Sequence, residues 1–383
     1  MRIKLSRVAI KVLLTPAAVI TVFLIILLRP LVSIRIYPLD SRFGHMISMV
    51  HANELRNRKL NANGRKREKT LYCLKGPSPN KFLVKKYRRK ILLATGSFAW
   101  LLNFAAKRLS MIFFYNPKDN ALLFYEDLPP LIQFSPSELS IGSKFLENRG
   151  QSFVCLNVRD KSYNESFVHS FGQLAKNWPM RDSDIETYKN AMSLLTERGF
   201  TVFRMGAQVE KRLEIDNPKI FDYATNGTRS EFLDFYLGST CKFAISTASG
   251  WDEIPTVFRR PLLLVNIFDM HTKFGANCLM FPKLFASHEK GDYLSLTELL
   301  DLHSSTNIIT VRDLTSEELV DAVTEMAQRV EGTFVETPEQ KEMQAKVKHI
   351  LSTHPKLQPT PNYYPIRAQF ASCFLSRYPN FLD

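Results

Sequence analysis

Residues 153–160 read Phe-Val-Cys-Leu-Asn-Val-Arg-Asp, an apolar run that ends in a charged pair. Six residues with a single polar side chain predict a strand that is buried on both faces, as in a parallel sheet. Similar runs return along the chain, separated by helical patterns, at residues 200–205, 220–224, 241–246 and 262–265. This alternation predicts an α/β fold with a parallel, doubly wound sheet.

Capping signals mark helix starts between and after these strands. Ser183 and Glu186 have capping-box spacing and predict a helix that ends at Gly199. Thr315 with Glu318, and Thr337 before Pro338, predict the starts of two closing helices.

The N-terminal third repeats the strand-and-helix pattern. A strand over 32–37, a helix over 46–58 and a strand over 70–74 predict a second α/β domain. Turn residues between 110 and 145 predict the crossing to the domain that follows. We therefore expect a membrane anchor over 1–30, a Rossmann-like domain over 31–145 and a second Rossmann-like domain with closing helices over 146–383.

The charge of the chain is uneven. The 383 residues have a formal net charge of +14, but residues 1–110 hold 23 basic and only 3 acidic side chains. A composition with 45% hydrophobic residues excludes a disordered chain. Five scattered cysteines argue against a disulfide scaffold and favour a reducing compartment.

Two apolar stretches lie within the basic third. Residues 12–28 carry no charge and are flanked by basic residues, which predicts a membrane-anchoring helix that spans or dips into the bilayer; a buried core helix is the alternative. Residues 91–106, bracketed by basic clusters, predict a helix on an anionic membrane surface or an ordinary core helix. The positive-inside rule then places the protein at the inner (cytoplasmic) membrane, with its body facing the cytoplasm. We expect no nucleic-acid partner, because no recognition module is visible.

Two arginines follow consecutive predicted strands. Arg159 with Asp160 comes after the first, and Arg204 with Gly206 after the next. Ligands bind beyond the carboxyl ends of parallel strands, and guanidinium groups suit a diphosphate. Surface salt bridges are the alternative interpretation.

A small-residue loop follows a third strand, with the sequence Ser246-Thr247-Ala248-Ser249-Gly250. Its hydroxyl and N–H groups predict an anion or ribose site at a helix start; a plain N-cap and turn is the alternative. The chain has no G-x-G-x-x-G or Walker pattern and no G-x-S-x-G around these serines. A nicotinamide site is therefore disfavoured, and a serine hydrolase is a weaker hypothesis.

The remaining candidates concern metal binding and proton transfer. Asp182-Ser183-Asp184 matches a metal-binding D-x-D by spelling, but helix capping explains it better, so we expect no metal. His45 is the first candidate for a general base, and Asp40 and Asp160 are rivals. A structural role for His45 is the alternative.

With these residues in view, the chain resembles a family of bacterial glycosyltransferases associated with surface-polysaccharide synthesis. The likeness covers roughly residues 32–290 and follows the order and spacing of residues 35–45, 154–160, 199–206, 221–224 and 234–250, with Asn266 after Pro261. It is also distantly similar to fucosyltransferase-like enzymes, in which a His-x-Arg holds a guanosine diphosphate. This chain has Asn157-Val158-Arg159 there, so the Arg carries over and the His does not.

The resemblance implies a metal-independent sugar transferase with two Rossmann-like domains facing a cleft. The nucleotide-diphosphate sugar would bind the second domain as a substrate, with no cofactor, and a glycan or lipid-linked acceptor would bind the first. Arg159, Arg204, Gly206, Ser246, Thr247, Ser249 and Gly250 would bind the donor, and His45 or Asp160 would serve catalysis. A non-catalytic, membrane-bound polysaccharide-assembly protein with a degenerate nucleotide fold is the alternative.

Overall fold

The computed structural model divides into two compact units, Met1–Gln133 and Phe134–Asp383. It describes residues 7–28, 33–39, 41–62, 68–108, 129–162, 179–267, 277–287, 291–301, 309–355 and 368–383. The division lies within the turn-rich stretch predicted as the crossing, of which residues 109–128 lie outside the described residues.

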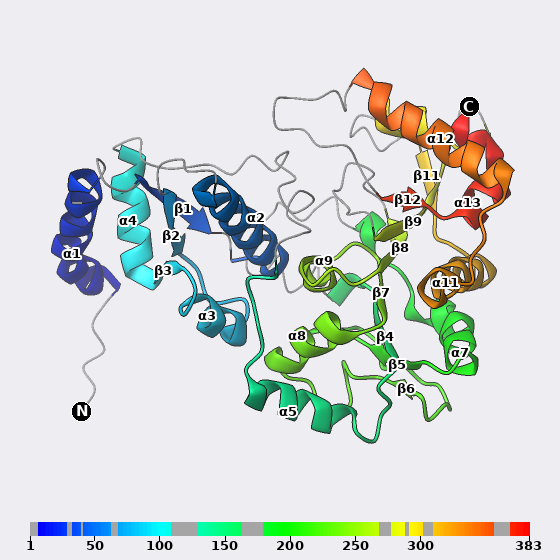
Figure 1. The fold of residues 1–383 in the computed structure, drawn as a ribbon, viewed down its shortest axis with the longest axis horizontal. Helices are drawn as coiled ribbons and strands as arrows, with labels where there is room; N and C mark the ends of the chain where they lie inside the picture. The colour runs from blue at the N-terminus through cyan, green and yellow to red at the C-terminus, as the bar shows by residue number, and fades with distance from the viewer. Residues whose placement is uncertain are drawn as a thin grey trace. The chain divides into compact units, whose positions relative to one another are not determined.

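The first unit is built on a parallel three-stranded sheet of order β1-β2-β3. Its elements are α1 (Arg7–Leu27), β1 (Ser33–Leu39), α2 (Phe43–Ala62), β2 (Glu68–Leu74), α3 (Lys81–Tyr87), β3 (Leu92–Thr95) and α4 (Gly96–Arg108). Helices α2 and α4 cover the sheet from opposite sides, and α1 packs on the outer side of α4 (Figure 1). The predicted strand–helix–strand of this unit is confirmed.

Helix α1 buries one stripe of small and branched side chains. Ala18, Val22 and Ile25 are at most 4% exposed and join a core that includes Leu102 and Ala106 of α4. Their spacing of four and then three residues places them on one side of the helix. Among the described residues no helix is long and apolar enough to cross a membrane, so the predicted transmembrane helix is not found.

The prediction of one helix over residues 91–106 is wrong, because this stretch contains a strand followed by a helix. Gly96, with φ of 65°, separates β3 from α4. A left-handed backbone is accessible to glycine at little cost, and this allows the chain to turn from the sheet into the helix. The helix buries Ala99, Leu102 and Ala106 and leaves Trp100 and Phe104 exposed.

The second unit contains a parallel seven-stranded sheet of order β12-β9-β8-β7-β4-β5-β6. Its strands are β4 (Phe153–Asn157), β5 (Thr201–Arg204), β6 (Ile220–Phe221), β7 (Phe243–Ser246), β8 (Leu262–Ile267), β9 (Cys278–Pro282) and β12 (Gln369–Phe370). In chain order β4 comes first, and the sheet grows outward from it to β6 on one side and then from β7 to β12 on the other. This is the doubly wound arrangement, with its reversal point between β4 and β7. The predicted α/β class and parallel sheet are confirmed.

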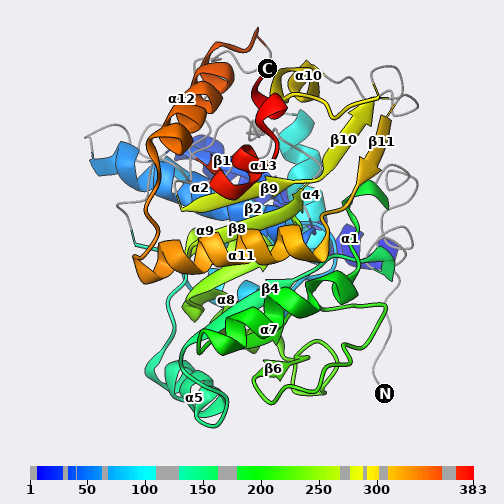
Figure 2. The ribbon, with the colours of Figure 1, turned by 90° about the vertical axis from the view of Figure 1, so that its right-hand side faces the viewer.

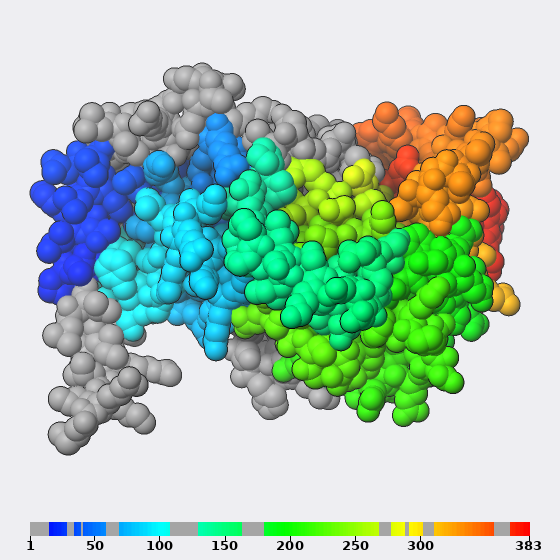
Figure 3. All heavy atoms as spheres, turned by 60° about the horizontal axis from the view of Figure 1, so that its bottom comes forward, coloured from blue at the N-terminus to red at the C-terminus, as the bar shows by residue number. Residues whose placement is uncertain are grey.

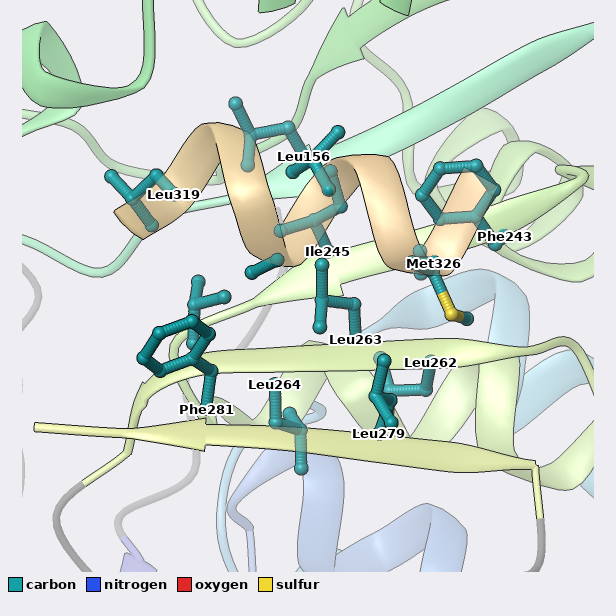
Figure 4. Close-up of a cluster of buried hydrophobic side chains, with 14 of the residues drawn as sticks. Leu156, Phe243, Ile245, Leu262, Leu263, Leu264, Leu279, Phe281, Leu319 and Met326 are labelled. Atoms are coloured by element: carbon teal, nitrogen blue, oxygen red, sulfur yellow. The ribbon is translucent and has the colours of Figure 1, made fainter. Parts of the chain in front are cut away.

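Helices cover both faces of this sheet (Figures 1 and 2). They include α7 (Lys189–Glu197), α8 (Glu231–Thr240), η5 (Gly250–Asp252), α9 (Glu253–Val257) and α11 (Ser316–Glu331). Helix α11 lies across the middle strands and directs Leu319 and Met326 at them (Figure 4). The strands β4, β5, β7, β8 and β9 are buried along their whole length, as the continuous apolar run predicts.

The other elements complete the unit. They are α5 (Pro136–Leu146), η3 (Pro179–Arg181), η4 (Ile185–Tyr188), β10 (Leu284–Ser287), α10 (Leu296–Asp301), β11 (Ile309–Arg312), α12 (Pro338–Thr353), α13 (Ser372–Arg377) and η8 (Pro379–Leu382). Strands β10 and β11 form a separate antiparallel pair, which the doubly wound prediction does not include.

The predicted caps at Thr315 and Thr337 are confirmed, since each forms a complete capping box. The cap predicted at Ser183 is wrong by one residue. Asp184 caps η4 by accepting a hydrogen bond from the N–H of Glu186, and η4 leads into α7. Because the first turn is a 3-10 helix, the capping side chain bonds to the N–H two residues ahead, and not three as in the predicted capping box.

Candidate functional site

The candidate site lies at the carboxyl ends of β4 and β7, where the strand order of the second unit reverses. Strand residue Asn157 pairs in register with Ser246 across this point. In doubly wound sheets the crevice outside the strand ends at this point is the usual ligand position. The sequence-predicted residues Arg159 and Ser246–Gly250 lie here.

Hydrogen bonds connect the two strand ends. The Asn157 side chain donates to the hydroxyl of Ser249 over 2.6 Å, and the N–H of Arg159 donates to the hydroxyl of Thr247 over 3.0 Å. The N–H of Thr247 in turn donates to the carbonyl of Asn157 over 3.3 Å. Thr247 and Ser249 therefore fix the loop after β7 against the end of β4.

The loop after β7 contains a left-handed residue that is not glycine. Ala248 has φ of 59°, a conformation that costs an alanine free energy, of order 1 kcal/mol. Arg181, which our sequence reasoning did not select, donates to the Ala248 carbonyl. Such strain persists only where neighbouring contacts hold it, and the Arg181 contact and the flanking Ser249 cap hold it here.

The start of η5 is closed by the chain itself. Ser249 accepts from the N–H of Trp251, and the Asp252 carboxylate accepts from the N–H of Ser249 over 2.7 Å. The N-cap that we gave as the alternative interpretation is therefore present at Ser249, and the predicted anion or ribose site stays a prediction. Part of the N–H array that we expected to bind an anion already donates to Asp252.

Asp252 is 5% exposed, and burial raises the pKa of its carboxyl to about 7. Contacts with Ser246 and Ser249 and the charge of Arg181 oppose the shift without cancelling it. A carboxyl that titrates near neutrality therefore lies behind the loop. The sequence did not reveal this carboxyl, because an acid in the first turn of a helix is common and is usually exposed to solvent.

A cavity of about 350 Å³ opens beside the ends of β4 and β5. The residues that line it are mostly charged: Val158, Asp160, Lys161, Asp182, Ser183, Asp184, Ile185, Glu210, Lys211 and Asp313. Both oxygens of Asp160 accept backbone hydrogen bonds, from Ser162 over 3.0 Å and from Glu210 over 2.7 Å. These bonds orient the Asp160 carboxylate at the cavity wall.

Arg159 and Lys283 are two buried cations at this edge. The Nε of Arg159 lies 3.2 Å from the Asp182 carboxylate, and the Arg159 side chain is 3% exposed. Lys283, which follows β9, donates to the Asp182 carbonyl over 2.8 Å and pairs with Asp313 over 2.5 Å. Burial is the main influence on Asp182 and raises its pKa against the opposing charges of Arg159 and Lys283.

The exposed lysines of the cavity are also paired with acids. Lys161 lies 2.5 Å from Glu210, and Lys211 lies 3.4 Å from Asp184. A diphosphate at this edge would therefore compete with carboxylates of the protein for its cations. The contacts of Lys283 could not be predicted from the sequence, because they join it to Asp182, 101 residues away, and to Asp313, 30 residues away. Asp182 was considered only as part of a D-x-D match, and its pairing with Arg159 was not foreseen.

Arg204 lies one strand away from the reversal point, at the end of β5. It is 1% exposed and donates to Asp222 over 3.0 Å and to the Lys211 carbonyl over 3.1 Å. Gly206 has φ of 153°, and a Cβ there would lie 2.5 Å from Val209. In this structure Arg204 and Gly206 shape the loop that follows β5, and their predicted contact with a donor stays a prediction.

His45 lies in the first turn of α2, in the first unit, where it is half-buried. Its predicted role as a base stays a prediction, and the rival Asp40 lies outside the described residues. Within the described part of the chain, no group of three or more His, Cys, Asp or Glu could hold a metal ion.

Comparisons with known proteins add little. No protein-family model matches the chain, and no curated protein matches it. Among solved structures, the E. coli ADP-heptose LPS heptosyltransferase II matches with a TM-score of 0.45 and 12% identity, over 78% of this chain and 99% of that one. So distant a likeness assigns neither a function nor a site to this chain.

Proposed function

We propose that the chain is a glycosyltransferase that moves a sugar from a nucleoside-diphosphate donor to a surface-polysaccharide or lipid-linked acceptor. The observation that carries the proposal is Arg159, which follows the first strand of a doubly wound sheet at the point where the strand order reverses. Anionic ligands bind at this position in doubly wound folds. The resemblance of the sequence to surface-polysaccharide glycosyltransferases supports the reaction class.

Donor binding would exchange one anion for another on Arg159. The guanidinium now pairs with Asp182, whose raised pKa reflects the cost of keeping a buried carboxylate charged. A diphosphate would replace this carboxylate with bidentate, charge-assisted hydrogen bonds. Thr247 and Ser249, which order the adjoining loop, would position the phosphates or the ribose.

The transfer step needs a base and a stabilised leaving group. The acceptor hydroxyl oxygen attacks the anomeric carbon, and the bond from that carbon to the diphosphate oxygen breaks with its electron pair on the diphosphate. Arg159 stabilises this developing charge. Asp160, oriented on the cavity wall, accepts the proton of the hydroxyl, and His45 of the first unit is the other candidate base.

We place this activity at the cytoplasmic face of the inner membrane. The support is the excess of basic residues in the first 110 positions, which suits an anionic leaflet.

The test is turnover by the purified full chain on a panel of UDP-, GDP- and ADP-sugars, with released nucleoside diphosphate as the readout. We expect release with one donor class and its loss in Asp160→Asn, with donor binding kept. Asp216→Asn is the matched control, since Asp216 is an exposed acid that precedes β6, at the edge of the sheet opposite the site. Full turnover in Asp160→Asn would remove Asp160 as the base.

One observation favours the non-catalytic alternative. The buried cations Arg159 and Lys283 already have carboxylate partners within the protein, as in a nucleotide fold that no longer binds its ligand. This alternative predicts no turnover with any donor, and no change in nucleotide affinity when Asp182 is replaced by Asn.

A further inference from the structure

From Thr15 to Leu27, where the side chains of helix α1 are described, the helix is largely apolar, and its buried residues form one stripe. Beside the buried Ala18, Val22 and Ile25, the large apolar side chains of this part are exposed: Val19, Ile20, Phe23, Leu24, Ile26 and Leu27. Phe23 and Leu27 are each 62% exposed. A solvent-facing helix normally carries polar residues on its uncovered side, so this surface is suited to an apolar environment.

Helix α4 adds an aromatic pair to this unit. Trp100 and Phe104 stack with ring centroids 5.6 Å apart and are 39% and 51% exposed. They stand four residues apart, and the exposed Lys107 follows at the next turn of the same side. Aromatic rings next to a basic residue are typical of the boundary between water and lipid headgroups. Figure 3 shows α1 (blue) at the surface of the first unit.

The charge of the unit indicates which apolar partner fits. Residues 1–110 contain 23 basic and 3 acidic side chains, whereas a protein partner for an apolar helix needs no such excess. Each basic group near an anionic leaflet contributes about 1 kcal/mol of attraction. Apolar side chains, interfacial aromatics and positive charge together match an anionic bilayer.

We propose that the exposed side of α1, with Trp100 and Phe104 of α4, docks on an anionic lipid bilayer. We name this surface the α1–α4 face. Its apolar side chains enter the acyl boundary while the basic residues of the unit stay among the headgroups. The inference goes beyond the proposed function, since it holds for a transferase and for a non-catalytic protein alike.

Vesicle binding by the full chain tests this proposal. The probes are vesicles of phosphatidylglycerol and phosphatidylcholine (1:1), with pure phosphatidylcholine as the charge control, in a co-sedimentation assay. We expect binding to the anionic vesicles and at least about tenfold weaker binding of the double variant Phe23→Gln, Leu27→Gln. The matched control is Leu139→Gln, Ile141→Gln on α5, which alters two exposed apolar residues of the second unit (46% and 58% exposed).

Insertion has its own readout. Brominated lipid should quench tryptophan fluorescence in the wild type, and Trp100→Phe should remove much of this quenching without a change in fold. Equal vesicle binding by the α1 and α5 double variants would overturn the proposal. A second result would also overturn it. If the wild type were a dimer in sedimentation velocity, and the α1 variant a monomer with unchanged vesicle binding, the exposed side of α1 would bind a second copy of the chain and not a bilayer.

Discussion

Asp252 illustrates how burial changes the chemistry of a single residue. Its carboxylate closes the loop after β7 through Ser249, yet burial raises its pKa to about 7. The folded protein therefore keeps a proton on Asp252 between about pH 4 and pH 7, whereas the unfolded chain releases it. Because the native state then binds more protons, stability falls as pH rises through this window and is constant above it.

We expect Asp252→Asn to remove this pH dependence. The amide oxygen can still accept from the N–H of Ser249, and there is no charge to bury. The difference in free energy of unfolding between the variant and the wild type should grow by up to about 4 kcal/mol from pH 4 to pH 7.5 in favour of the variant. Urea denaturation at several pH values measures it. A constant difference would show that Asp252 titrates normally.

The residues at the site divide into those that local pattern reveals and those that it does not. Arg159, Thr247 and Ser249 could be predicted to meet, because each follows a strand of a parallel sheet. Lys283 could not, because β9, the strand that it follows, was not predicted. Arg181 and Asp182 could not, because they lie in and next to η3, a segment with no strand pattern. The pairing of the buried cations with acids also depends on these distant contacts.

At the scale of elements, the start of α11 gathers several polar contacts on one acid. Glu318 completes the Thr315 capping box and also accepts from both terminal nitrogens of Arg312, over 3.0 and 2.9 Å, and from Tyr378. Burial would raise the pKa of this acid, but these hydrogen bonds outweigh it and lower the pKa to about 2.

Replacement of Glu318 by Gln should destabilise the protein by about 2 kcal/mol near neutral pH, because charge-assisted bonds are lost. A depressed pKa contributes stability that is present above the unfolded value and is lost as pH falls from about 4.5 to about 2. The variant should therefore lose less stability than the wild type over that window in thermal unfolding. Glu317→Gln, in the same turn, is the control; equal acid sensitivity of wild type and Glu318→Gln would contradict this account.

Packing of α5 on α8 depends on the absence of one side chain. A Cβ at Gly142 would lie 2.2 Å from the ring of Tyr236. Glycine to alanine in a helix normally stabilises by up to about 1 kcal/mol, but here the methyl group must push the ring or the helix aside. We expect Gly142→Ala to cost about 2 kcal/mol by chemical denaturation, and Ser140→Ala, exposed on the same helix, to be nearly neutral.

Many helices and strands could be located from the sequence, but some boundaries and strand pairings could not. Buried runs located the strands β4 to β8, and capping boxes located α11 and α12. Strands β9 and β12 of the main sheet were not predicted, and β12, α13 and η8 follow the two helices that were expected to close the chain. The stretch 91–106 was misassigned because apolar composition does not separate a strand from a helix, and Gly96 was the signal that divides the two. The antiparallel pair β10 and β11 forms outside the main sheet and has no distinct local pattern.

At the scale of the whole molecule, the chain separates into two parts with different charge. The first 110 residues are strongly basic, and the rest holds 28 basic and 34 acidic side chains. The first part carries the α1–α4 face, and the second carries the site at the reversal point of the sheet. Charge and periodicity predicted a chain of two parts, because both are properties of long segments and do not depend on individual contacts. The division into two compact units is observed, whereas membrane contact by the first and donor binding by the second stay predictions.

The most direct test of the account is calorimetric binding of UDP, GDP and ADP to the full chain. We predict that Arg159→Ala weakens binding at least about tenfold, because it removes charge-assisted bonds to the diphosphate. Asp182→Asn should tighten binding, since the competing carboxylate is gone. Arg198→Ala should have no effect, because Arg198 precedes β5, at the edge of the sheet opposite the site, and pairs with Glu331. Wild-type affinity in a folded Arg159→Ala, or no binding of any of the three nucleotides, would contradict the proposed donor site.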